Sequence, residues 1–204
     1  LNNPLLINFG ELTQYIPELK PKENIISQDN DSVTKEIYFD TPMGKKGWLL
    51  KQMKKIATVK ISESVRARVS GKKDFELFEW FLEIVKKADW SKCAQDIREK
   101  KEEIKDRAIT GIFLVPPFEL LYWTKREDLF LLYFDYPEKF HHAMDCIIQG
   151  FDIIMATAGE LGIDFACYGA PGGTEFTSPA IWKKAIVPSS AKIEALAKKH
   201  GMNI

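Results

Sequence analysis

Residues 109–115 read ITGIFLV, and Pro116 and Pro117 follow directly. A short apolar run that proline ends is typical of a strand buried on both faces, as in a parallel sheet. Residues 163–168, IDFACY, form a second run of this kind, and helical patterns fill the chain between the two runs. Because strands that alternate with long helices build parallel βα units, the sequence predicts an α/β fold.

Two helices are expected between these strands. One runs from about residue 118 to 134, and Asp135 and Pro137 open a longer one that Gly162 ends. The apolar side of the longer helix holds Phe140, Met144, Ile147, Phe151, Ile154, Ala158 and Leu161.

The C-terminal segment predicts one more helix. Ser178 and Pro179 suit its first turn, Pro188 predicts a bend, and residues 200–201 (HG) suit its end. Residues 202–204 then resemble the beginning of another strand. Because the chain lacks an initiator Met and stops within this motif, we expect it to be the central piece of a longer protein.

Upstream of residue 109 the sequence predicts a hairpin or small sheet and two helices. Residues 33–40 (VTKEIYFD) suit a strand, 41–44 (TPMG) a turn, and 47–50 and 57–61 partner strands. From Asp74, which suits a helix N-cap, the period becomes helical. The apolar stripe of that helix holds Phe75, Phe78, Phe81, Leu82 and Val85, and a second, highly charged helix is expected from residue 89 to 107.

The composition is that of a globular chain with one good core. Of 204 residues, 45% are hydrophobic, and no stretch approaches the roughly 20 apolar residues of a membrane span. Cys93, Cys146 and Cys167 show no disulfide or zinc spacing. We expect a soluble, cytoplasmic protein that forms a single domain over residues 1–204.

The net charge of zero conceals a basic segment. Residues 1–43 carry a charge of −4, residues 44–73 carry +9, and residues 74–204 carry −5. The basic segment, which completes a hairpin region over residues 33–73, would suit a polyanionic ligand. It would also suit lysines that protect the edge of a hairpin, and we favour this second interpretation. The charge balance argues against a nucleic-acid-binding surface.

The candidate ligand-binding residues follow the two buried strands, because functional loops leave the carboxyl ends of parallel strands. Phe118, Tyr122 and Trp123 come after the first strand. Tyr168 ends the second, and its glycine-rich loop contains Gly169 and Glu175. We expect both loops to face one cavity. The alternatives are a plain connection for the glycine-rich loop, core packing for Tyr122 or Trp123, and a solvated Glu175.

No catalytic residue is assigned from the sequence. The chain contains no Ser-His-Asp, HExxH or paired-carboxylate constellation, and no P-loop or dinucleotide-binding glycine pattern. His141 and His142 lie in the first turns of the long helix, so we interpret them as surface or packing residues. No metal ligand is assigned either.

The order of these motifs resembles the uroporphyrinogen decarboxylase superfamily. The motifs are residues 41–44 (TPMG), 116–118 (PPF), 131–138 (LLYFDYPE), 177–182 (TSPAIW), 187–188 (VP) and 200–201 (HG). The resemblance covers most of the chain from about Val33 onward. It implies a (β/α)8 TIM-type barrel, present here as an incomplete barrel with a hairpin near its N-terminus.

Three functions follow in order of preference, and the resemblance implies the first two. The first is methyl transfer between a corrinoid and a thiol acceptor, since the Thr-Pro-x-Gly turn resembles the methyltransferase-like and uncharacterised branches more than the decarboxylases proper. The second is decarboxylation of uroporphyrinogen-type tetrapyrroles in porphyrin biosynthesis, although Trp123 stands where the decarboxylases carry a tyrosine. The third is a non-catalytic, truncated binding domain.

The resemblance also implies cofactors and partners. Zinc and a corrinoid would belong to the complete protein, with zinc held by a His-x-Cys pair beyond Ile204 and a later Cys, so no cofactor is assigned to this chain. The partner would be a small molecule or a corrinoid. A corrinoid protein that carries the corrinoid is a further option. An oligomer is compatible with this, whereas nucleic acid and membrane partners are not expected.

Overall fold

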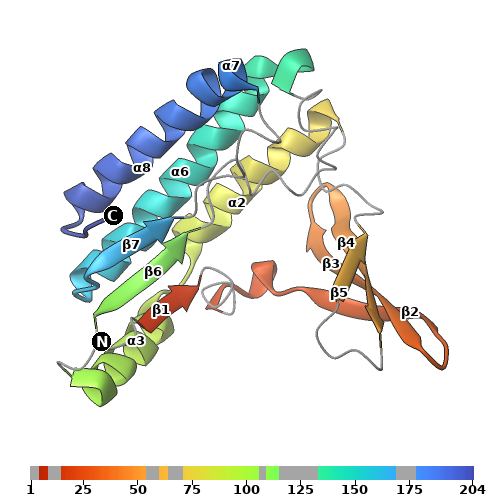
Figure 1. The fold of residues 1–204 in the computed structure, drawn as a ribbon, viewed down its shortest axis with the longest axis horizontal. Helices are drawn as coiled ribbons and strands as arrows, with labels where there is room; N and C mark the ends of the chain where they lie inside the picture. The colour runs from red at the N-terminus through yellow and green to blue at the C-terminus, as the bar shows by residue number, and fades with distance from the viewer. Residues whose placement is uncertain are drawn as a thin grey trace.

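The computed structural model describes residues 5–8, 15–53, 60–63, 71–105, 109–114, 133–168 and 178–204. These residues build a parallel sheet of three strands and an antiparallel sheet of four strands. Long helices lie against the parallel sheet, and the antiparallel sheet stands apart from them (Figure 1). The described helices include none that is long and apolar enough to cross a membrane.

The parallel sheet contains the two predicted buried strands as neighbours. β6 (Thr110–Leu114) lies in the middle, with β1 (Leu5–Asn8) on one side and β7 (Phe165–Tyr168) on the other. Where the sequence predicted a strand to begin at residue 202, Asn203 forms a single isolated parallel bridge with Phe165, and the described residues 202–204 form no strand. The parallel α/β arrangement predicted for this half of the chain is therefore confirmed.

The prediction of a (β/α)8 TIM-type barrel, even an incomplete one, is wrong. A barrel closes only when its last strand pairs with its first. Here β1 and β7 lie on opposite sides of β6, and the other four described strands form the separate antiparallel sheet. The described chain is a mixed α/β fold with an open parallel sheet. The apolar runs predict strands and their neighbours, but closure depends on pairing between distant strands, which a local pattern does not encode.

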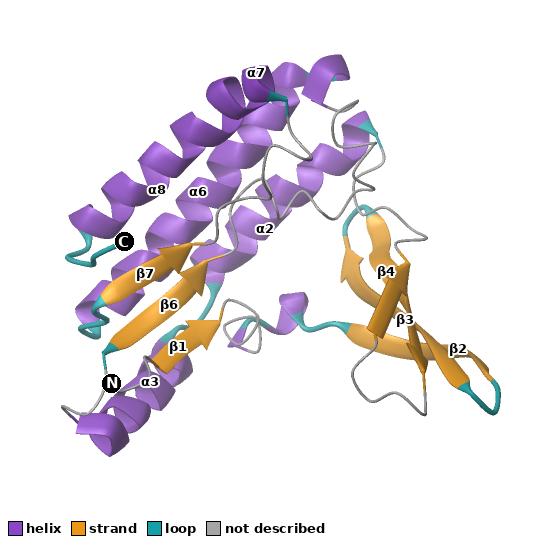
Figure 2. Cartoon of the chain, in the orientation of Figure 1, coloured by secondary structure: helices purple, strands orange, loops and turns teal. Residues whose placement is uncertain are grey.

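Three long helices lie side by side against the parallel sheet. α6 (Pro137–Glu160) runs between α2 (Glu76–Lys87) and α8 (Val187–Lys199), as Figure 2 shows. The fourth, α3 (Ser91–Ile104), follows α2 along the chain and buries Cys93. The predicted stripe of α6 is confirmed, since all of its residues are buried except the half-buried Leu161. Gly162 follows the helix with a φ of +68°, a conformation that favours glycine.

The start of α2 differs from the prediction that Asp74 is its N-cap. A 3₁₀ turn, η3 (Lys72–Phe75), precedes the helix, and no side chain caps its first turn. The carboxylate of Asp74 instead lies 2.5 Å from the ammonium group of Lys46. The capping prediction is wrong because a lysine distant in sequence pairs with this carboxylate.

The antiparallel sheet has the order β2-β3-β4-β5 and contains the predicted hairpin. Its strands are β2 (Lys22–Gln28), β3 (Ser32–Thr41), β4 (Gly44–Met53) and β5 (Lys60–Glu63), and a short 3₁₀ helix, η2 (Pro17–Leu19), precedes them.

The geometry of the β3–β4 turn explains why Thr and Gly occupy its first and last positions. The Thr41 hydroxyl donates to the Gly44 carbonyl at 2.6 Å and accepts the Met43 N–H at 3.2 Å. Gly44 has a φ of +90°, which strains any other residue.

The last helical segment begins as predicted and changes its winding before Pro188. Ser178 caps α7 (Pro179–Ile181) by accepting the Ile181 N–H at 3.4 Å. A π-helical turn, η6 (Trp182–Ile186), then leads into α8. Because Pro188 lacks an N–H and its ring would clash with the carbonyl four residues earlier, a wider turn relieves the conflict.

Candidate functional site at the carboxyl edge of the parallel sheet

The carboxyl ends of β6 and β7 lie next to each other. Leu114, the last residue of β6, pairs with Tyr168, the last residue of β7. The segments 115–132 and 169–177 therefore leave the sheet at adjacent positions, as the sequence predicted. Most of the predicted site residues lie outside the described residues: Phe118, Tyr122, Trp123, Gly169 and Glu175. Tyr168 is described by its backbone, which brings it to this edge.

An anchor at the opposite edge sets the register that aligns these ends. The Asp164 carboxylate accepts hydrogen bonds from the Thr110 N–H at 2.6 Å and from the Thr110 hydroxyl at 2.7 Å. The Asp164 N–H donates in return to the Thr110 carbonyl at 3.0 Å. These hydrogen bonds, the one from the Thr110 backbone foremost, hold the pKa of Asp164 below its ordinary value.

The two faces of this sheet differ in burial. Ile112, Leu114 and Ala166 are fully buried in the core, whereas Phe113, Phe165 and Cys167 on the alternate positions are only half-buried. Gly111, which pairs with Phe165, leaves room for its ring, since a Cβ there would overlap the ring unless it shifted. Near the carboxyl edge the half-buried face offers one aromatic ring, that of Phe113, and the Cys167 thiol, whereas Phe165 lies at the amino end of β7. Sequence reasoning did not single out these residues, although the alternation of a strand places them on one face.

Cys167 is the cysteine with the least burial of the three. Cys93 and Cys146 are fully buried. Burial raises the pKa of the Cys93 thiol to about 11, and burial together with the nearby Glu79 raises that of Cys146. Since the thiolate is the reactive and metal-binding form, neither buried cysteine suits a nucleophile or a zinc ligand.

A cavity of about 300 Å³ lies where α6 begins. Tyr136 stands at the N-cap with Pro137 in the first turn, and the Tyr136 ring packs edge-on against Phe75 at 6.3 Å. The walls carry two lysines and two carboxylates, and the cavity is lined by Lys72, Asp135, Tyr136, Pro137, Glu138 and Lys139. This mixture suits a small polar molecule that carries both donors and acceptors. The Asp135 and Pro137 signature predicted the helix start but not the cavity.

The interpretation that lysines of the basic segment protect the edge of a hairpin stays a prediction, because the segment contributes β5, at the edge of the described sheet, and much of it lies outside the described residues. Lys45, Lys46 and Lys51 lie on β4, which pairs with β3 on one side and β5 on the other. Lys46 pairs with Asp74, and the Lys45 ammonium lies 4.4 Å from the centre of the Tyr38 ring. Two of these cations are thus engaged within the chain.

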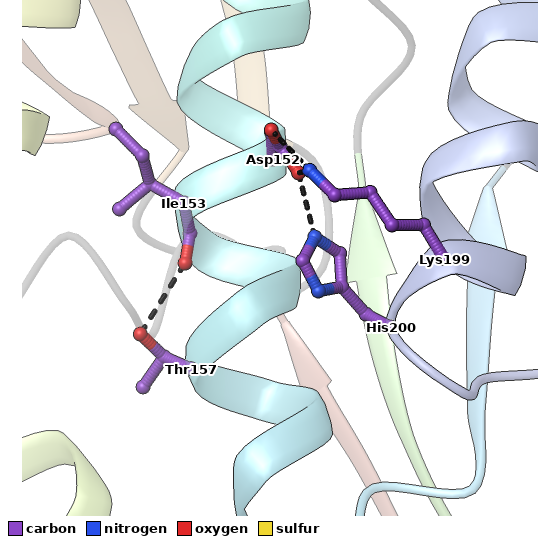
Figure 3. Close-up of polar contacts among 5 residues, drawn as sticks. All are labelled: Asp152, Ile153, Thr157, Lys199 and His200. Carbon is purple, nitrogen blue, oxygen red and sulfur yellow. Dashed lines mark hydrogen bonds and ion pairs between the residues drawn. The ribbon is translucent and has the colours of Figure 1, made fainter.

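A carboxylate, an imidazole and an ammonium group meet between α6 and the end of α8 (Figure 3). Asp152 lies 2.6 Å from His200 Nε2, and both of its oxygens lie 3.0 Å from the Lys199 ammonium. Burial raises the pKa of Asp152, but the hydrogen bonds from His200 and Lys199 outweigh it and leave the pKa lowered. This cluster fastens the C-terminus of α8 to α6, where cations also favour the helix dipole.

A second cluster resembles a catalytic triad only in composition. His142 Nε2 lies 2.8 Å from Glu79 Oε1 and 3.7 Å from Cys146 Sγ. A triad uses both ring nitrogens, one toward the nucleophile and one toward the carboxylate. Here both neighbours contact the same nitrogen, so the imidazole cannot pass a proton between them. The prediction that His141 and His142 are surface or packing residues is confirmed, because both are exposed and the His141 ring packs against Tyr133.

Zinc does not fit the residues that the structure describes. Among them, no three His, Cys, Asp or Glu side chains form a group that could hold a metal ion. Comparison with known proteins adds no assignment, because the sequence matches no protein-family model and no curated protein.

Proposed function

We propose that this chain forms part of a binding site for a flat, tetrapyrrole-derived macrocycle in an enzyme related to the uroporphyrinogen decarboxylase superfamily. The observation that carries the proposal is the pairing of Leu114 with Tyr168. Because of this pairing, the aromatic segment 115–132 and the glycine-rich segment 169–177 both begin at the same edge of the sheet. The half-buried Phe113, next to the last residue of β6, supplies apolar surface on the adjoining face, which suits a macrocycle ring.

We assign methyl transfer between a corrinoid and a thiol acceptor as the reaction of the complete protein. The resemblance of the Thr41-Pro42-Met43-Gly44 turn to the methyltransferase-like and uncharacterised branches supports this assignment. The corrinoid supplies the methyl group when bound. The described residues shape the site and exclude water, and no thiol-activating zinc step is assigned to them.

Decarboxylation of a carboxylated tetrapyrrole is the second candidate. This reaction needs cations that hold carboxylate side chains, and Lys72 and Lys139 line the cavity at the start of α6, where Asp135 and Glu138 balance their charge. The engagement of Lys45 and Lys46 within the chain counts against a broad polyanion surface on the antiparallel sheet.

A fluorescence titration separates the candidates. Hydroxocobalamin and an octacarboxylic porphyrin are added in turn, and quenching of the tryptophan emission gives each affinity. We expect hydroxocobalamin to bind, and Phe113→Ala to weaken it by roughly tenfold, as loss of an aromatic contact does.

Lys192→Ala serves as the matched control. Lys192 lies on α8 and forms an exposed ion pair with Asp145 of α6, so this variant should bind hydroxocobalamin normally. Binding of the porphyrin without the corrinoid would favour decarboxylation. Binding of neither macrocycle, or equal weakening in the control, would refute the proposed site.

A further inference from the structure

We propose that the cavity at the start of α6 binds a small zwitterion, a molecule of amino-acid size that carries one carboxylate and one ammonium group. The proposal does not depend on the macrocycle site. Its first support is the charge of the walls, because Lys72 and Lys139 contribute two cations and Asp135 and Glu138 contribute two carboxylates. At about 300 Å³ the cavity lies at the lower end of the volumes of small-molecule sites.

The four charged side chains of the cavity do not pair with one another. None of them forms a hydrogen bond or an ion pair with any residue that the structure describes. Farther along the same helix, carboxylates do pair with lysines, since Asp145 lies 2.6 Å from Lys192 and Asp152 lies 3.0 Å from Lys199. The cavity therefore brings together charges of both signs that a ligand can engage.

The backbone at Tyr136 explains why these charges stay apart. Residues 133–135 are helical and α6 begins at Pro137, but Tyr136 between them has a φ of −138° and a ψ of 56°, outside the helical range. The ring of a proline disfavours the helical conformation of the residue before it. In an unbroken helix, Asp135 and Lys139 would lie four residues apart on one face and could form an ion pair. The break separates them, so both charges line the cavity without neutralising each other.

The walls of the cavity are held in place by the core. Lys72 belongs to η3, which also contains the buried Phe75, and the Tyr136 ring packs edge-on against Phe75. The turn and the helix start are thus joined before any ligand binds, which lowers the ordering cost of binding. Tyr136 and Pro137 add apolar surface that the carbon atoms between the two charges of a ligand can contact. In Figure 1, α6 begins on the side toward which β6 and β7 point, the side on which ligands of open α/β sheets bind.

The balance of charge selects a zwitterion over a singly charged ligand. The two lysines attract a simple anion, but the two carboxylates repel it, and the reverse holds for a simple cation. A molecule with opposite charges at its two ends can place each end near the wall groups of the other sign. Specificity then comes from repulsion of the wrong ligands as well as attraction of the right one.

Titrations followed by two-dimensional NMR of the whole chain test this proposal. The zwitterionic probes are glycine, 4-aminobutyrate and 6-aminohexanoate, whose charges lie progressively farther apart. Butyrate and butylammonium each keep only one charge of 4-aminobutyrate. We expect the best zwitterion to shift the amide signals of Lys72, Tyr136 and Lys139 saturably and to bind about fivefold more tightly than either singly charged probe. The amide signals of β2 should not move.

Variants at the cavity should weaken binding of the best zwitterion. Lys72→Gln and Glu138→Gln each remove one exposed charge, and we expect each to lower the affinity about fivefold, the upper range for an exposed charge pair. Lys92→Gln at the start of α3 and Glu160→Gln at the end of α6 are the matched controls, because both side chains are exposed and lie outside the cavity lining. Both controls should bind as the wild type does.

Three results would overturn the proposal. The absence of a saturable shift with all three zwitterions would show that the cavity is not a site for this class of ligand. Binding of butyrate or butylammonium as tight as that of the best zwitterion would show that one charge alone is recognised. Equal weakening in the cavity variants and their controls would show an effect of overall charge rather than of the cavity.

Discussion

At the residue scale, Asp164 connects the sequence to the geometry of the site. Its carboxylate accepts two hydrogen bonds from Thr110 and thereby fixes how β7 lies along β6. Such hydrogen bonds to a charged acceptor are stronger than neutral ones, although Asp164 is exposed and water competes for it. A side chain at the amino edge thus aligns the strand ends at the carboxyl edge.

Replacing Asp164 by Ala should lower the free energy of unfolding at pH 7 by about 1 kcal/mol. This value is small for hydrogen bonds to a charged group, because the Asp164 side chain is exposed to water. The folded pKa of Asp164 is lowered, so the carboxylate stabilises the fold above its unfolded pKa of about 3.9. That contribution is lost as the pH falls through the folded pKa. Urea denaturation at several pH values measures the difference between wild type and variant.

The difference should shrink below about pH 4. Glu160→Ala, an exposed carboxylate at the end of α6, should show no comparable loss. A difference that stays constant across this pH range would mean that the Asp164 charge plays no part.

At the element scale, the segment from α7 to α8 shows how a helix accommodates an internal proline. The π-helical turn before Pro188 widens the backbone. The buried Ser189 hydroxyl then donates to the Ala185 carbonyl at 2.8 Å. A side chain therefore satisfies a carbonyl within the disturbed turn, and the helix continues to Lys199.

Ser189→Ala should lower the free energy of unfolding by about 1 kcal/mol, because a buried carbonyl loses its hydroxyl donor. Chemical denaturation monitored by circular dichroism gives this value. Ser190→Ala is the matched control, since the Ser190 hydroxyl makes no hydrogen bond to a described residue. Equal effects of the two variants would contradict the role assigned to Ser189.

At the scale of the whole molecule, the sequence predicts what is local. The apolar runs predict β6 and β7, the stripe of α6 is confirmed, and the β3–β4 turn follows from its Thr, Pro and Gly. What depends on distant partners was missed. β1 pairs with a strand about a hundred residues later, and Lys46 takes the carboxylate that a local rule assigns to a helix cap.

The features of the candidate site also divide into those that the local sequence predicts and those that depend on distant residues. Alternation and strand order predict that two loops start at one edge, and the structure confirms their starting points. The side chains proposed to contact ligand lie outside the described residues, apart from the backbone of Tyr168. The cavity at the start of α6 was missed because it needs η3 from another part of the chain.

If the segments after β6 and β7 form one macrocycle site, a bound corrinoid should protect both of them at once. Hydrogen exchange with and without saturating hydroxocobalamin measures this directly. We predict slower exchange in residues 115–132 and 169–177 together, with no change in β2 or β3. Protection of only one segment, of neither, or of the antiparallel sheet instead would contradict a shared site at the carboxyl edge of the parallel sheet.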